Sequence, residues 1–250
     1  MQIPKSIFEI KQIAKQIIRR EPMSILKLGW APLLLLMGLI YLAMQSLMQF
    51  SSQFSPNVTY NQVYTAMAKW LNNNPQVYLY VTEGRLAYFL VSIGVAFTCL
   101  DLIRQPKQAP HWDGAWQVFS GRYFFATIAL WLIVFVLCRV GLLLTSFLGL
   151  LVMLFIRYSF LMSYFIYKDL TQKQSLTWRQ TLQTLNLSWQ LMRGHRMRLF
   201  FLDVSFWGWD LLNYFSMGAF NLYVAPYKAA SYAVFYQDLI NLNGNNLGVK

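Results

Sequence analysis

Charged side chains are scarce in this chain, and acidic ones are the scarcest. Asp and Glu together number 9 against 21 Lys and Arg, and charged residues make up only 12% of the 250 residues. A soluble domain of this length carries about twice that charged fraction. The composition therefore excludes an ordinary soluble enzyme or soluble binding domain.

Motifs of catalysis and of metal or phosphate binding are also absent. The sequence has no H-E-x-x-H, no G-x-S-x-G and no glycine-rich phosphate-binding loop. His111 and His195 are the two histidines, and neither has a second His or Cys at metal-ligand spacing. Cys99 and Cys138 fall toward opposite ends of successive apolar segments, too far apart for a disulfide. We therefore expect no catalytic residue, no metal and no cofactor.

Long apolar runs are what the chain has in abundance. Hydrophobic residues make up 57% of it, and the twenty residues from Leu28 to Leu47 include no charged side chain. A helix rises about 1.5 Å per residue and the hydrocarbon core of a bilayer is roughly 30 Å thick, so about twenty apolar residues make one crossing. This run predicts a transmembrane helix.

Five further segments repeat that pattern. The predicted crossings are Leu28–Leu47, about Leu86–Ile103, two segments between Arg122 and Lys168 that meet at an outer turn marked by Arg139, Gly141 and Ser146, about Leu199–Ala219 and about Leu222–Leu239. A weak internal repeat aligns Trp116–Arg122 with Trp189–His195, each just before a pair of crossings. The predicted fold class is an all-α polytopic membrane helix bundle of about six transmembrane helices, arranged as three helical hairpins.

The distribution of basic residues predicts the orientation. Sixteen of the 21 fall in segments that lie on one side by alternation, which the positive-inside rule assigns to the cytoplasm. We therefore attribute the net charge of +12 to topology and not to nucleic-acid binding. The predicted organisation is a cytoplasmic amphipathic helix over residues 1–27, a single transmembrane domain over 28–241 with an outer loop at 50–85 and inner loops at 104–121 and 168–198, and a cytoplasmic tail at 242–250. Both termini are then cytoplasmic, at the cell membrane.

Amphipathic stretches precede the first and fifth crossings. Ile7, Ile10, Ala14 and Ile17 share one face of the leading helix at 3.6-residue spacing, opposite its basic residues. A similar stripe runs from Trp178 to Met192, with Gly194 placed to end the helix. These interfacial helices predict anchoring to anionic lipids on the cytoplasmic face, with lipid regulation or partner docking as alternatives. The candidate lipid contacts are Lys5, Lys15, Arg19, Arg193, Arg196 and Arg198.

The C-terminal quarter carries a family resemblance. The stretch from Ser188 to Trp209 reads SWQLMRGHRMRLFFLDVSFWGW, and Pro226-Tyr227 and Ala233–Tyr236 follow it. In these residues the chain resembles the bacterial integral-membrane family known as domain-of-unknown-function 975. The resemblance implies a multi-spanning protein of the cytoplasmic membrane with no established activity, and it supplies no catalytic residues.

Ionisable residues inside the apolar segments are the best functional candidates, because each is costly in hydrocarbon and must face protein or water. Counted from the inner surface, Arg157, Asp210 and Lys228 lie about 16, 18 and 15 Å deep. We predict that they form a midplane cluster, with Asn213 as a further member. Asp203 lies nearer the surface and is expected to pair with Arg196, Arg198 or water. The cluster is either a structural ion pair or a site for a ligand or ion.

Three function classes follow. The first is a non-enzymatic scaffold or modulator of cell-envelope components, with a membrane-protein partner or a second copy of the chain as its contact. The second is a transporter or channel for a small solute, including an anionic one, which would use the midplane charges. The third and least favoured is an intramembrane enzyme.

Overall fold

The computed structural model describes residues 3–20, 22–52, 60–105, 112–143, 147–173 and 176–243, and these ranges contain helices and no strand. The elements are α1 (Ile7–Arg20), α2 (Pro22–Ser51), α3 (Tyr60–Asn73), α4 (Pro75–Arg104), the 3-10 helix η1 (Trp112–Phe119), α5 (Phe124–Leu143), α6 (Phe147–Phe160), α7 (Ser163–Lys173), α8 (Trp178–Leu191), α9 (Arg196–Val204), α10 (Trp207–Phe215) and α11 (Asn221–Asn243). The predicted all-α class is confirmed.

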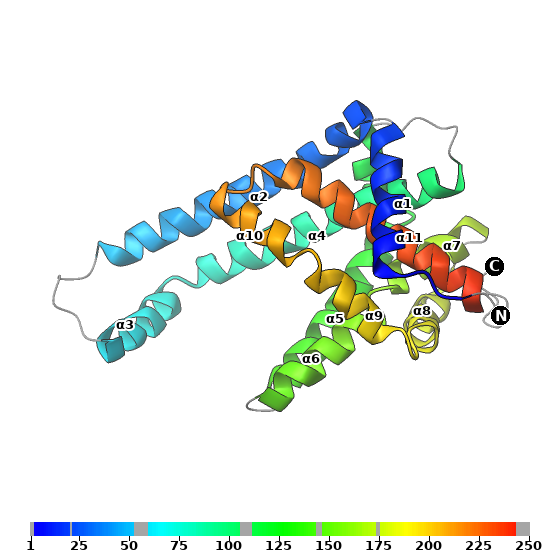
Figure 1. Ribbon diagram of the computed structural model, residues 1–250. Helices are drawn as coiled ribbons and strands as arrows, with labels where there is room; N and C mark the ends of the chain where they lie inside the picture. The colour runs from blue at the N-terminus through cyan, green and yellow to red at the C-terminus, as the bar shows by residue number, and fades with distance from the viewer. Residues whose placement is uncertain are drawn as a thin grey trace.

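Helix α11 lies at the centre of the molecule and packs against α1, α2 and α4 (Figure 1). Small side chains allow this close packing, since Ala229 and Ala233 on α11 and Ala96 on α4 are all buried. Glycines allow the same close approach at two contacts between helices. A Cβ on Gly29 would lie 2.1 Å from the carbonyl oxygen of Leu222, and one on Gly94 would lie 2.0 Å from that of Ala115. Backbones therefore touch where α2 meets α11 and where α4 meets η1.

Two helical arms extend from this centre (Figure 1). One consists of α2 and α4, with α3 at its far end, and the other is the α5–α6 hairpin. Both arms expose large apolar side chains, among them Leu34 and Tyr41 on α2 and Leu132 on α5. Such wide apolar exposure is expected of surface that meets lipid or another protein rather than water.

Four stretches of the described residues are long and apolar enough to cross a membrane. They are Pro22–Ser51, Pro75–Arg104, Phe124–Gly141 and Leu148–Gln172. These stretches overlap the first four predicted crossings. The fifth, Leu199–Ala219, is not one helix, because a turn at Ser205–Phe206 divides it into α9 and α10. The sixth coincides with the single helix α11, which is not among the four.

Three predicted loops contain helical structure. Residues 50–85, predicted as the outer loop, hold α3 and the first turns of α4. The inner connection at 104–121 holds η1, and that at 168–198 holds the end of α7 and all of α8. His111 and Ser146, which the sequence analysis named, lie outside the described residues, as do residues 53–59 and 244–250.

The leading amphipathic helix packs differently from the prediction. Its stripe of Ile10, Ala14 and Ile17 is buried, and α1 packs on α11, so protein and not lipid covers that face. Helix α8, in contrast, buries mainly polar residues. Its buried side carries small polar residues and Leu191, while Trp178 stays exposed. Gly194 has a φ of 84° and follows α8, at the place where the sequence predicts the helix to end.

Candidate functional site

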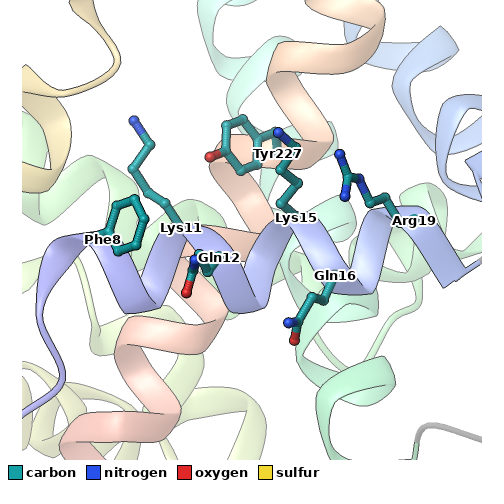
Figure 2. A pocket seen from close by; sticks show the side chains of 7 residues that line it. All are labelled: Phe8, Lys11, Gln12, Lys15, Gln16, Arg19 and Tyr227. Atoms are coloured by element: carbon teal, nitrogen blue, oxygen red, sulfur yellow. The ribbon is translucent and has the colours of Figure 1, made fainter.

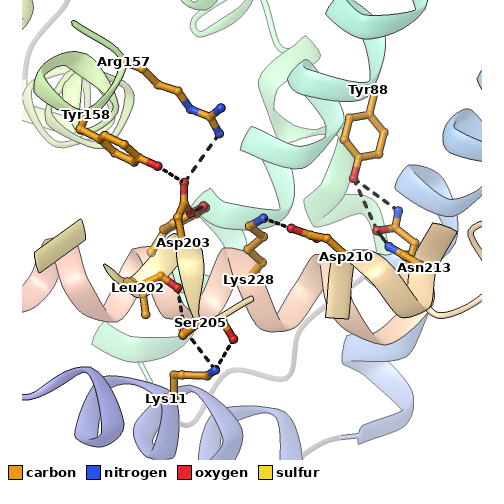
Figure 3. A network of polar contacts seen from close by, with 12 residues as sticks. Lys11, Tyr88, Arg157, Tyr158, Leu202, Asp203, Ser205, Asp210, Asn213 and Lys228 are labelled. Atoms are coloured by element: carbon orange, nitrogen blue, oxygen red, sulfur yellow. Dashed lines mark hydrogen bonds and ion pairs between the residues drawn. The ribbon is translucent and has the colours of Figure 1, made fainter. Parts of the chain in front are cut away.

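A polar network surrounds the turn between α9 and α10 (Figure 3). The Ser205 hydroxyl donates to the carbonyl oxygen of Leu202 at 2.6 Å, and the Phe206 N–H donates to that of Asp203 at 2.9 Å. Both bonds span three residues and tighten the backbone where α9 ends. From α1, the Lys11 ammonium donates to the Ser205 carbonyl and hydroxyl oxygens, both at 3.1 Å. A cation therefore caps the carbonyl end of α9 at the turn.

Asp203, on α9 just before the turn, is the most enclosed acid of the network. Its carboxylate accepts hydrogen bonds from Tyr158, at 3.0 Å, and from Tyr232, and it lies 3.7 Å from Nη2 of Arg157. Its side chain is 8% exposed, so these partners replace the water that the carboxylate has lost. The prediction that Asp203 pairs with Arg196, Arg198 or water is wrong.

The predicted midplane cluster is divided between two places. Lys228 Nζ donates to Asp210 Oδ2 at 3.1 Å, so these two residues meet as predicted. Arg157 instead joins Asp203, one helix segment away. The depth estimate assumed one straight helix from Arg157 to Lys168, but α6 ends at Phe160 and the chain turns at residues 161–162 before α7. The turn at Ser205–Phe206 also separates Asp203 on α9 from Asp210 on α10, and the two aspartates take different cations.

Asn213 is also separate from the Asp210–Lys228 pair. Its Nδ2 donates to Asn221 Oδ1 at 3.1 Å, and Asn221 Nδ2 donates to the Tyr88 hydroxyl at 3.4 Å. This small amide chain joins α10 and α11 to α4 (Figure 3). Asn213 Oδ1 is buried and has no hydrogen-bond donor within the part of the chain that the structure describes.

A second charged cluster links α4 to α7 and was missed from the sequence. Lys168 Nζ donates to Asp101 Oδ2 at 2.6 Å, although its side chain is only 1% exposed. Arg104 forms a bidentate pair with Asp169 at 2.6 and 2.8 Å, and Tyr236 donates to the same carboxylate at 2.7 Å. The sequence contained a signal for this cluster. Asp101 and Arg104 lie within one turn at the end of one predicted apolar segment, and Lys168 and Asp169 are adjacent at the end of another.

The six candidate lipid contacts fall into two groups. Arg198 pairs with Asp238, and the Arg196 guanidinium stacks on Phe155 and Trp189 at 4.2 and 4.3 Å from the ring centroids, so protein uses both arginines. A lipid role of these two arginines stays a prediction. Lys15, Arg19 and Arg193 have exposed side chains, and Lys5 is half-buried where its backbone N–H donates to Asp238 at 3.3 Å.

A groove runs along α1 (Figure 2). It is lined by Phe8, Lys11, Gln12, Lys15, Gln16, Arg19 and Tyr227. Its volume is about 490 Å³ and it is open to the outside. Partial burial lowers the pKa of Lys11 below the ordinary value for lysine.

The described residues contain no group of three or more His, Cys, Asp or Glu side chains placed to hold a metal ion. Cys99 and Cys138 are free thiols, in agreement with their predicted separation.

A model of the family described as protein of unknown function (DUF975) matches residues 151–243. The resemblance predicted from the C-terminal quarter is confirmed, and it extends back into α6. Comparison with curated proteins and with solved structures gave no match.

The two aspartates of the network should respond differently to neutralisation. Asp203→Asn leaves the hydroxyls of Tyr158 and Tyr232, together with Arg157, without their carboxylate, so we expect a loss of about 2–3 kcal/mol of stability. Asp210→Asn changes a pair whose side chains are 46% and 26% exposed, and we expect a loss of at most about 1 kcal/mol in detergent. Thermal unfolding of both purified variants in one detergent measures the difference. Equal losses would show that burial does not distinguish the two pairs.

Proposed function

We propose that this chain, which carries the DUF975 domain over residues 151–243, is a multi-pass protein of the bacterial cytoplasmic membrane that acts as a non-enzymatic scaffold or modulator of cell-envelope components. The observation that carries the proposal is the closed pairing of the charges at the ends and in the interior of the apolar helices. Each of Asp101, Asp169, Asp203, Asp210 and Asp238 forms an ion pair with a Lys or Arg on another helix.

Pairs of this kind favour a structural role. A charge that must bind and release a ligand needs an open position beside it, whereas a carboxylate already held by a cation and by hydroxyl donors is fixed in place. Asp203 and Asp169 have both kinds of partner. The network therefore supports a rigid frame that presents surfaces to other molecules.

We propose six crossings, with both termini on the cytoplasmic side. Four are supported by length and composition. For the fifth and sixth, the broken helix α9–α10 runs back along α11 in Figure 1, which supports a final hairpin whose first member is kinked. Trp207, Tyr214 and Phe215 on α10 are strongly exposed, as expected for a segment surrounded by lipid.

The exposed face of the α5–α6 hairpin is the proposed contact surface. Leu132 on α5 and Leu148 on α6 project outward, whereas Leu130 on the inner side of α5 is fully buried. Lipid covers such a face by default, and a partner helix in the membrane covers it when the protein acts as a scaffold.

The orientation predicts opposite accessibility of two exposed basic positions. In a Cys99→Ala, Cys138→Ala background, Lys69→Cys on α3 should react with a membrane-impermeant maleimide applied to intact cells, because α3 is placed outside. Arg179→Cys on α8 should react only after the membrane is permeabilised. Labelling of both positions from the same side would contradict the topology.

The scaffold role predicts a protein neighbour at the hairpin. A photoreactive amino acid at Leu132 should crosslink reproducibly to one identified envelope protein, or to a second copy, in native membranes. The same group at Leu130, two residues away and buried, serves as the matched control and should give no intermolecular product. Adducts to lipid alone at Leu132 would count against the scaffold.

A transporter is the second candidate, and the broken helix favours it. Discontinuous helices with charged groups beside the break build the central sites of many secondary transporters. Here Asp210 lies one turn beyond the break and pairs with Lys228, and both side chains are partly exposed.

Flux measurements separate the two candidates. We expect proteoliposomes containing the protein to pass chloride and phosphate no faster than empty liposomes, and Asp210→Asn to change nothing. Glu83→Gln, which removes an exposed carboxylate from α4, is the matched control. Flux in the native protein that disappears in a folded Asp210→Asn variant and persists in the control would establish the transporter instead.

A further inference from the structure

We propose that the groove along α1 binds the phosphate-bearing headgroup of an anionic membrane lipid as a discrete site. This inference rests on the membrane location proposed above. It differs from the sequence prediction, in which basic residues spread over two helices anchor the protein through their charge alone.

Three cations form a ladder along the groove. Lys11, Lys15 and Arg19 are spaced four residues apart, so successive positions lie about 6 Å apart along the axis of α1. Figure 2 shows all three side chains extending from the same side of the helix, the side on which Tyr227 of α11 lies, while Gln12 and Gln16 extend from the other. The ladder therefore concentrates positive charge along one edge of α1.

No acid of the helix balances this ladder. Glu9 is the only acidic residue of α1, and its carboxylate accepts hydrogen bonds from the backbone and hydroxyl of Ser6, at 2.6 and 2.9 Å. Like charges four residues apart on a helix repel each other and destabilise it. A bound phosphate would relieve that repulsion, which is why an anion fits this edge better than a neutral ligand.

The packing of α1 and the lining of the groove favour a lipid headgroup as the source of the bound anion. The apolar stripe of the helix is buried and α1 packs on α11, so this stripe is not available for insertion into a bilayer. The groove itself supplies apolar surface at one end, from Phe8, and on its floor, from Tyr227. A headgroup with its glycerol backbone matches a site that combines cations with aromatic rings.

The position of the groove agrees with headgroup depth. Helix α1 ends at Arg20 and α2 begins at Pro22, so the two are joined almost directly. On α2 the large apolar side chain of Met23 is exposed in the first turn and Lys27 in the second, and most of the exposed large apolar side chains of this helix follow from Trp30 onward. Figure 1 shows α1 lying across the end of the α2–α4 arm, where a headgroup layer would run.

Lys11 connects the lipid site to the network of Figure 3. Its ammonium has three N–H donors, and two of them are used by Ser205. The ammonium also lies 4.5 Å from the centroid of the Phe206 ring, and a phosphate oxygen that accepts from the third N–H would leave the cap on α9 in place. A bound headgroup would thus hold α1 against the turn between α9 and α10.

The test is titration of the detergent-purified full chain with phosphatidylglycerol and with phosphatidylcholine, followed by native mass spectrometry. We expect the native protein to retain phosphatidylglycerol in preference to phosphatidylcholine. The Lys15→Gln, Arg19→Gln double variant should weaken phosphatidylglycerol binding on the order of tenfold or more, because each basic residue near a membrane surface contributes appreciably to anionic-lipid affinity. Neither side chain forms a hydrogen bond or an ion pair within the described part of the chain, so the variant should fold.

A Lys69→Gln, Arg179→Gln variant removes the same charge from exposed positions of α3 and α8, and it should bind as the native protein does. Excess inorganic phosphate should not displace the lipid, whereas displacement would assign the groove to free phosphate. Equal weakening by both double variants would overturn the site and leave only diffuse attraction. These outcomes are independent of the maleimide labelling, which alone decides whether the chain spans the membrane as proposed.

Discussion

Three polar side chains on one face of α11 hold three aspartates of other helices. Lys228, Tyr232 and Tyr236 are spaced four residues apart and donate to Asp210, Asp203 and Asp169, respectively. A carboxylate in apolar surroundings is stable only when donors or cations replace its water. The position of α11 therefore fixes where α10, α9 and α7 can lie, and the rest of the structure depends on this constraint.

The DUF975 match covers α11 and the three helices whose aspartates it holds, α7, α9 and α10. Residues 151–243 contain both members of the Arg157–Asp203, Asp210–Lys228 and Arg198–Asp238 pairs, so these charges are balanced within the matched segment. The N-terminal half joins it through α4, by the pairs of Asp101 with Lys168 and Arg104 with Asp169. Helix α1 adds Lys11 at the turn after α9. The architecture is therefore a C-terminal unit whose charges are paired internally, with the N-terminal helices packed against it.

This arrangement relates the two proposals to each other. The buried pairs make a frame, the α5–α6 hairpin extends from it as an apolar arm, and α1 lies across the end of the α2–α4 arm with its basic edge outward. Since α1 contacts α11 and, through Lys11, the turn between α9 and α10, a lipid bound at its edge would act on the frame directly. The same elements would serve a scaffold whose position depends on the composition of the inner leaflet.

The sequence by itself determined the helical class, the apolar character of the first four predicted crossings, the end of α8 shortly before Gly194 and the pairing of Asp210 with Lys228, because hydropathy, glycine conformation and charge are properties of short segments. It did not determine that Asp203 pairs with Arg157, that Lys168 is buried, or that the apolar stripe of α1 packs on α11 and not on lipid. Those outcomes depend on turns at residues 161–162 and 205–206 and on which helix lies beside which. A linear pattern gives the depth of a charge along a straight helix, but only tertiary structure decides which donors reach it once the helix bends.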